Sequence, residues 1–202
     1  MVVLASAVLP RMVRADEAPV LVVLGDSLSA GYGIDVDLSW TALLQARLAE
    51  QGYEHRVVNA SISGETTEGG ATRIDDIIAR LEPAVVVIEL GGNDGLRGFP
   101  PTRTRDNLTR IIEASRSAGA AVALLGIRIP SNYGPRYIRA FEGTFRDVAA
   151  AQDIPWIEFF MDGVALDDEL MQSDGIHPNA AAQPRLLDNA WPVIEAAIEA
   201  AE

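Results

Sequence analysis

The chain has 202 residues, of which 49% are hydrophobic and 22% charged, a balance typical of one globular domain with or without a short leader. Its formal net charge of −13 disfavours nucleic acids and anionic membrane surfaces as general partners. It contains no cysteine, which excludes disulfides and thiolate metal sites, and no lysine, which excludes Schiff-base chemistry, the phosphate-binding P-loop and the Ser-x-x-Lys hydrolases.

The N-terminal segment, residues 1–18, is interpreted as either a signal peptide or a disordered leader. It contains a short apolar stretch, Val2–Leu9, but no basic leading region, since Arg11 and Arg14 follow that stretch. We favour export, and hence a periplasmic or secreted protein, with a cytoplasmic protein as the alternative. Residues 19–202 are then a single domain. No apolar run approaches the roughly 20 residues of a membrane-spanning helix, so no stable membrane insertion is expected.

Five short apolar runs without polar alternation recur along the rest of the chain, a pattern typical of strands that are buried on both faces of a parallel sheet. The runs are Val20–Leu24, Arg56–Ala60, Ala84–Leu90, Ala121–Ile127 and Ile154–Phe159. Helices are predicted at Trp40–Gln51, Thr67–Leu81, Thr102–Ala118, Tyr137–Gln152 and from near Pro184 to Ala201. The alternation predicts an α/β three-layer sandwich with helices on both faces of the sheet and right-handed crossovers. Pro192 is expected to kink or divide the last helix.

A serine closely follows the first predicted strand. Gly25 permits a tight exit from that strand, and a helix beginning near Ser27 would point free N–H groups toward the serine hydroxyl. The Gly25-Asp26-Ser27 motif is weak by itself, because Asp and Ser are also ordinary turn and N-cap residues. Ligands of such folds bind beyond the carboxyl ends of the strands, which makes Ser27 a candidate nucleophile.

A serine needs a base, and the chain has two histidines. His55 lies between Glu54 and Arg56 at the start of a predicted strand and is interpreted as a solvated surface residue. His177 lies in a glycine- and proline-marked loop after the last predicted strand, three residues after Asp174. Asp174 could accept a hydrogen bond from one ring nitrogen of His177 and so fix its tautomer, which favours a catalytic histidine; the alternative role of Asp174 is a helix cap or turn former.

Acyl transfer also needs hydrogen-bond donors for the developing oxyanion. Asn93 lies in the segment Gly91–Gly95, directly after a very apolar strand, and its side-chain amide could supply one donor. The backbone N–H of Gly64, in the segment Ser61–Glu65, could supply another. Asn-Asp-Gly is also ordinary turn chemistry, so neither segment is persuasive alone.

Taken together, these segments resemble the SGNH or GDSL hydrolase family, and among its members the bacterial multifunctional thioesterase, lysophospholipase and arylesterase group. The resemblance covers Val20–Trp191. It is carried by Gly25–Ser29, Asn59–Gly64, Glu89–Gly98, Asn132–Gly134 and Asp174–Asn179. Four of these blocks in the right order are far more specific than any one of them.

The resemblance implies a flavodoxin-like, five-stranded parallel sheet. It also implies that Ser27 is the nucleophile, His177 the general base and Asp174 the acid that orients it. The oxyanion hole is then formed by the backbone N–H groups of Ser27 and Gly64 together with the side chain of Asn93.

The expected function is hydrolysis of acyl esters and thioesters, such as acyl-CoA, lysophospholipids and aryl esters, through an acyl-enzyme on Ser27. The expected partner is this small-molecule substrate, with no cofactor and no metal, and the chain is expected to be a monomer. Apolar loop residues are candidates for contact with the acyl chain, although they could equally cover the sheet edge. They are Leu28, Ile34, Leu96, Phe99, Tyr133, Phe160 and Met171.

Three other functions stay open at this point. A carbohydrate acetylesterase of the same family would use the same site. A non-catalytic acyl-binding protein on the same scaffold would bind lipid without hydrolysing it. A metal-dependent phosphoesterase would need several metal ligands, whereas the chain has only two histidines. Its candidate ligands are Asp26, Asn93, Asp94, Asp174 and His177.

Overall fold

The computed structural model of the protein describes residues 18–202, so the leader predicted at residues 1–18 lies almost wholly outside the described residues. Its five strands form one parallel sheet in the order β2-β1-β3-β4-β5. The strands are β1 (Val20–Gly25), β2 (Arg56–Asn59), β3 (Val85–Glu89), β4 (Ala121–Leu125) and β5 (Trp156–Ile157). This strand order is that of flavodoxin-like folds, which confirms the predicted fold class.

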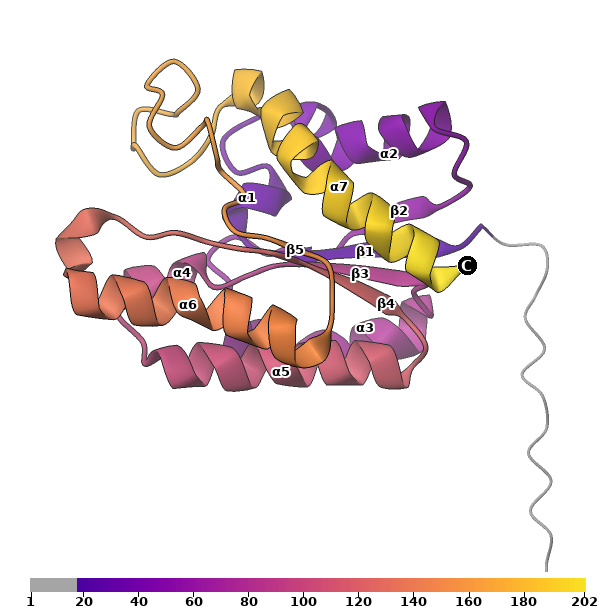
Figure 1. Cartoon of the computed structure of the whole chain (residues 1–202). Helices are drawn as coiled ribbons and strands as arrows, with labels where there is room; N and C mark the ends of the chain where they lie inside the picture. The colour runs from indigo at the N-terminus through magenta and orange to yellow at the C-terminus, as the bar shows by residue number, and fades with distance from the viewer. Residues whose placement is uncertain (1–17) are drawn as a thin grey trace, which may run out of the picture.

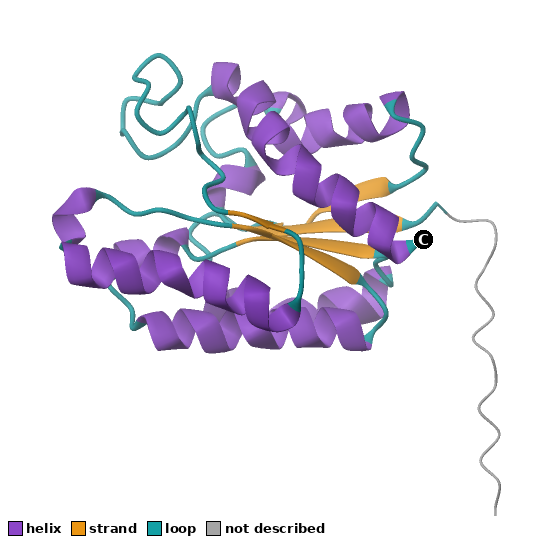
Figure 2. Ribbon diagram, in the orientation of Figure 1, coloured by secondary structure: helices purple, strands orange, loops and turns teal. Residues whose placement is uncertain are grey.

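Helices cover both faces of the sheet (Figures 1 and 2). One layer contains α1 (Ser27–Ala30), α2 (Trp40–Glu50) and α7 (Gln183–Ala201). The opposite layer contains α3 (Thr67–Leu81), α5 (Pro101–Ser117) and α6 (Pro135–Gln152). The short elements are α4 (Gly92–Leu96) and the 3-10 turns η1 (Val36–Leu38), η2 (Ser131–Tyr133) and η3 (Ala180–Ala182). In the part of the chain that the structure describes, no helix is both long and apolar enough to cross a membrane.

Apart from Glu89 at the end of β3, the central strands consist of apolar residues and glycine, because both of their faces are buried. In β1, Val22 and Leu24 pack on the α3, α5 and α6 side, whereas Leu21 and Val23 pack on the α2 and α7 side. All four side chains are completely buried, and each contributes roughly 1.5–3 kcal/mol of hydrophobic stabilisation. The non-alternating runs in the sequence therefore reflect a sheet between two helical layers.

Two elements differ from their predictions. The last strand is confined to Trp156–Ile157, because β5 is an edge strand that pairs only with β4 and its run contains Pro155, which has no N–H to donate. The last helix continues through Pro192 without being divided, whereas a kink at this proline stays a prediction. Buried residues before and after the proline, including Leu187 and Ile194, pack against the sheet and hold α7 as one helix.

The parallel arrangement brings the carboxyl ends of the strands to one end of the sheet. The short helices α1 and α4 lie there, together with the long loop between β5 and α7 (Figure 1). This is the end at which ligands bind in open α/β sheets.

Candidate active site

Ser27 is the first residue of α1 and is half-buried at the end of β1. The preceding residue, Asp26, caps the helix by accepting a hydrogen bond from the N–H of Leu28 at 3.1 Å. Gly25 is required at the turn, because a Cβ atom there would lie 2.7 Å from the Oγ atom of Ser29. Ser27 is the first residue of α1, so its backbone N–H has no acceptor within the helix.

The structure brings the three predicted catalytic side chains into one hydrogen-bonded chain. His177 Nε2 lies 2.9 Å from Ser27 Oγ, and His177 Nδ1 lies 2.7 Å from Asp174 Oδ2. The other oxygen of Asp174 accepts the backbone N–H groups of His177 at 3.0 Å and of Ile176 at 2.9 Å. These contacts from His177 and Ile176 hold the pKa of Asp174 well below its usual range, so the carboxylate stays ionised beside the imidazole.

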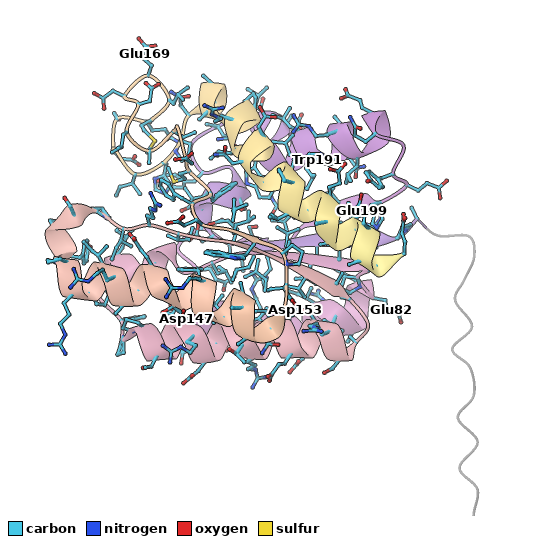
Figure 3. The ribbon with its side chains drawn as sticks, viewed as in Figure 1. Glu82, Asp147, Asp153, Glu169, Trp191 and Glu199 are labelled. Atoms are coloured by element: carbon cyan, nitrogen blue, oxygen red, sulfur yellow. The ribbon has the colours of Figure 1, made fainter. Side chains whose placement is uncertain are left out.

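The loop that carries Asp174 and His177 is anchored to the segment after α1. Gln172 Nε2 donates to the backbone oxygen of Tyr32 at 2.8 Å, and the ring of Tyr32 lies 4.5 Å from that of His177. Figure 3 shows Glu169 on the outer side of this loop, directed away from the body of the protein. Tyr32, which sequence reasoning missed, therefore forms one side of the histidine site.

The predicted oxyanion donors flank the same turn. Asn93 lies in α4, and its Nδ2 atom donates to Asp26 Oδ2 at 3.0 Å. The segment before Gly64 is held beside the nucleophile turn by the N–H of Ile62, which donates to the oxygen of Gly25 at 3.1 Å. Gly64 has a φ of +81°, which favours glycine, and its oxygen accepts from Arg97 Nη2 at 3.1 Å.

Two buried carboxyl groups lie behind the nucleophile turn. Asp26 is 2% exposed and Glu89 completely buried. Glu89 Oε2 accepts the hydroxyl of Ser29 at 2.7 Å and the N–H of Asp26 at 3.4 Å, whereas its Oε1 atom has no hydrogen-bond partner among the described residues. Burial raises the pKa of Asp26 to about 6, and burial together with the nearby charge of Asp26 raises the pKa of Glu89 well above its ordinary value.

Sequence reasoning gave Glu89 no role of its own. The available signal was an acidic residue at the end of the otherwise apolar strand β3, whose central residues are buried on both faces. A carboxyl group in that position needs a polar partner inside the protein.

Of the candidate acyl-chain contacts, Leu96, Phe99 and Tyr133 are half-buried and lie in segments that are joined by hydrogen bonds. The hydroxyl of Tyr133 donates to the oxygen of Leu96 at 2.7 Å, and that of Tyr137 donates to the oxygen of Phe99 at 2.7 Å.

Three further candidates lie elsewhere around the site. Ile34 and Met171 are half-buried in the segments that the Gln172 contact joins, and Leu28 packs against both halves of the core. The assignment of these residues to the acyl chain stays a prediction.

Phe160 is a correction to the predicted set. It is completely buried and packs edge-on against Trp40, with ring centroids 5.3 Å apart. Its N–H bonds the oxygen of Gly126, which continues the pairing beyond β5 and holds the residue against the sheet. Phe160 is therefore a core residue with no exposed surface in this structure, and not an exposed loop residue as predicted.

His55 is a second correction, because its side chain is 6% exposed instead of solvated. It lies against the ring of Tyr53, with ring centroids 6.3 Å apart, and burial lowers its pKa. It takes no part in the hydrogen-bonded chain that contains Ser27.

Asp94 has a structural role in this arrangement. Its Oδ2 atom accepts the N–H of Thr67 at 2.9 Å, and its Oδ1 atom accepts the hydroxyl of the same threonine at 2.5 Å. Both carboxylate oxygens are thus engaged at the start of α3, where they satisfy an unpaired N–H of the helix. Within residues 18–202, no group of three or more histidine, cysteine, aspartate or glutamate side chains is placed to hold a metal ion.

Comparisons with known proteins all relate this chain to lipases, esterases and thioesterases. The model of the GDSL-like Lipase/Acylhydrolase family matches residues 23–184. The chain is 53% identical to esterase TesA of Pseudomonas aeruginosa over 178 residues, which are 88% of this chain and 89% of the relative. It is 45% identical over 175 residues to thioesterase 1/protease 1/lysophospholipase L1 of Escherichia coli K12, covering 87% of this chain and 83% of the relative. The crystal structure of the psychrotrophic esterase EstA from Pseudoalteromonas sp., inhibited by monoethylphosphonate, matches with a TM-score of 0.83 and 41% identity over 88% of this chain and 97% of that one.

Proposed function

Because this chain belongs to the GDSL-like lipase and acylhydrolase family and is a serine ester hydrolase, we propose that Ser27 is its nucleophile and forms the acyl-enzyme. The observation that carries this assignment is the chain of contacts from Ser27 through His177 to Asp174, at 2.9 and 2.7 Å. A hydroxyl, an imidazole and an ionised carboxylate in hydrogen-bond contact are the groups that nucleophilic acyl transfer requires.

The proposed reaction has two steps. Ser27 Oγ attacks the acyl carbonyl while His177 Nε2 takes its proton, and the alcohol or thiol leaves after protonation by the same imidazolium. Water then attacks the acyl-enzyme, with His177 again acting first as base and then as acid. Asp174 holds the imidazole in the tautomer with its proton on Nδ1 and stabilises the imidazolium that forms.

The oxyanion of each tetrahedral intermediate is proposed to accept hydrogen bonds from the N–H groups of Ser27 and Gly64 and from the amide of Asn93. The N–H of Ser27 is at the positive end of α1, where a developing negative charge is favoured. Donors that are already held in place need little reorganisation when the charge appears, so they lower the barrier to the chemical step.

The proposed substrates are acyl esters and thioesters, a class consistent with the printed names of the relatives. Leu96, Phe99 and Tyr133 are proposed to contact the acyl chain on one side, and Ile34 and Met171 on the other. We propose further that the protein acts as a monomer, which rests on its family membership. We also propose that it is exported, which rests on the sequence of residues 1–18. A series of nitrophenyl esters of increasing length tests the acyl-chain site, since an acetylesterase loses activity beyond two carbons.

Labelling with a fluorophosphonate tests the nucleophile. We expect the wild-type protein to be labelled on the peptide that contains Ser27 and to lose ester hydrolysis in proportion to labelling. Ser27→Ala should abolish both, whereas Ser117→Ala, which changes an exposed serine at the end of α5, should change neither. Full labelling of the Ser27→Ala variant, or label on another serine, would contradict the proposal.

A further inference from the structure

We propose that Asp26 is a positioning residue of the oxyanion hole. It orients the side-chain amide of Asn93 so that one N–H donates to the carboxylate of Asp26 and the other N–H points toward the substrate. This inference rests on the proposed role of Asn93. It goes beyond the capping of α1, for which a carboxylate is not needed, because Asn and Ser cap helices about as well as Asp.

The two oxygens of Asp26 hold two different elements. Its Oδ1 atom accepts the N–H of Leu28 at 3.1 Å, at the start of the helix that carries the nucleophile. Its Oδ2 atom accepts Nδ2 of Asn93 at 3.0 Å, in α4. One carboxylate therefore joins the nucleophile turn to the proposed oxyanion donor, through two N–H donors that both need an acceptor.

A freely rotating Asn93 amide would present its oxygen to the substrate as readily as its nitrogen, because the terminal torsion of asparagine is broad and roughly two-fold. An amide oxygen facing the oxyanion would repel it. The carboxylate of Asp26 selects the useful orientation, since it attracts the NH₂ group and repels the amide oxygen. The second N–H is then left for a different acceptor.

The surroundings of Asp26 show that this contact is built into the fold. The side chain is 2% exposed, so water cannot readily replace the carboxylate. A Cβ atom at Gly92 would lie 3.2 Å from Asp26 Oδ2, so the absence of a side chain there lets α4 begin against the carboxylate.

The nucleophile turn is also held by hydrogen bonds from residues of β3 and α2. The N–H of Asp26 donates to Glu89 Oε2 at 3.4 Å, and the same oxygen accepts the hydroxyl of Ser29 at 2.7 Å. Trp40 Nε1 in turn donates to the Oγ atom of Ser29 at 3.3 Å. These contacts extend from β3 and α2 and leave the carboxylate of Asp26 little freedom to move away from Asn93.

The charged and titratable groups that act on Asp26 are Glu89 from β3, Asp94 from α4 and His177 from the last loop. Burial raises the pKa of Asp26 to about 6, against which its hydrogen bonds with Leu28 and Asn93 favour ionisation. At neutral pH the carboxylate is therefore ionised and accepts on both oxygens.

The variant Asp26→Asn separates positioning from capping. An amide of the same shape has one acceptor and one donor, so it can cap Leu28 or hold Asn93 but cannot do both. We expect kcat on a short nitrophenyl ester to fall by at least about 100-fold with KM within about threefold, the size expected when one oxyanion donor is lost. Asp35→Asn is the matched control, because Asp35 caps η1 through a single bond to the N–H of Asp37 and should leave kcat unchanged.

A double-mutant cycle with Asn93→Ala shows whether Asp26 acts through Asn93. If it does, the double variant Asp26→Asn/Asn93→Ala is no slower than Asn93→Ala alone, within about threefold. Multiplied losses in the double variant would overturn the inference, because Asp26 would then act through another group such as His177. A near-normal kcat for Asp26→Asn beside a slow Asn93→Ala would also overturn it, and would leave the proposed function intact.

Two further results complete the test. A near-normal kcat for Asn93→Ala would overturn both the inference and the proposed role of Asn93, while fluorophosphonate labelling of Ser27 would still report on the nucleophile. If Asp26→Asn fails to fold in a thermal melt, Asp26→Ser takes its place, because a serine hydroxyl can cap α1 but cannot reach a second donor. We expect the same loss of kcat from that variant.

Discussion

Gly25 and Glu89 are register partners across β1 and β3, so the strand that ends at the nucleophile turn lies beside a strand that ends in a buried carboxyl group. A Cβ atom on Gly25 would lie 2.9 Å from Glu89 Oε2, which shows how closely the two backbones and the carboxyl group are packed. The carboxyl group supports the turn through Ser29 and Asp26 while its own ionisation is disfavoured by burial. Glu89 therefore holds the nucleophile turn in place, while the burial of its carboxyl group lowers the stability of the fold when that group ionises.

Replacing Glu89 with glutamine should stabilise the fold increasingly as the pH rises. The pKa of Glu89 is raised in the folded state, so its contribution to stability is fully present below the unfolded pKa near 4.5 and is lost as the pH rises toward the folded pKa. The melting temperature of Glu89→Gln minus that of the wild type should grow between pH 5 and pH 9. The exposed variant Glu50→Gln controls for removal of a charge. A constant difference across this range would show that Glu89 ionises as easily as an exposed glutamate.

Replacing Asn93 with alanine should lower kcat by roughly 100- to 1,000-fold, because one oxyanion donor is removed. The effect on KM should be smaller, since the donor acts on charge that develops only in the transition state. Steady-state kinetics on a nitrophenyl ester measure both quantities. An unchanged kcat would remove Asn93 from the mechanism.

Replacing Asp174 with asparagine should lower kcat by on the order of 10⁴-fold, since the imidazole of His177 loses the carboxylate that fixes its tautomer. Asparagine can still cap the turn at Ile176 and His177, so the fold should be kept, as a thermal melt would show. Activity close to that of the wild type would leave Asp174 as a structural turn residue only.

The acid side of the pH profile should include the protonation of Asp26. As the pH falls through about 6, Asp26 gains a proton and can no longer accept from both Leu28 and Asn93. The fall of kcat on the acid side should therefore be steeper in the wild type than in Asp26→Asn, which has no carboxyl group to protonate at this position. The same pH dependence in both proteins would mean that protonation of Asp26 does not affect turnover.

Shortening Leu96 and Phe99 to alanine should change the preference for acyl-chain length, because both half-buried side chains lie in the segment that Tyr133 and Tyr137 anchor. Each lost apolar contact should reduce kcat/KM for long-chain nitrophenyl esters by about 10-fold or more, with a smaller effect on acetate. Leu166→Ala, at a fully exposed residue, is the control. Equal effects on short and long chains would remove these two residues from the acyl-chain site.

Much of the fold could be predicted from local pattern. The five apolar runs predicted five strands and their burial on both faces, and the α3 bounds, Thr67–Leu81, agree with those expected. The exceptions were β5, shortened at the sheet edge, and α7, which continues through Pro192. In both cases packing against neighbouring elements decided what the local sequence alone left open.

The candidate site was predictable to the extent that its parts are local motifs. Asp174 and His177 are three residues apart, so their contact could be predicted from a single turn. Ser27 could be identified as a candidate because it lies just after an apolar strand. The exposure of His55 and the position of Phe160 were wrong, because whether a side chain near a strand end faces the core depends on which element covers it.

The sequence by itself therefore determined the alternation of buried strands and amphipathic helices, and which residue types stand at the strand ends, because both are set by short-range periodicity and turn chemistry. Only the tertiary structure decided that Asp26 holds Asn93, 67 residues away, and that Glu89 lies behind the nucleophile turn. Those contacts depend on strand register and on the docking of α4 against α1, which arise from the packing of the whole sheet.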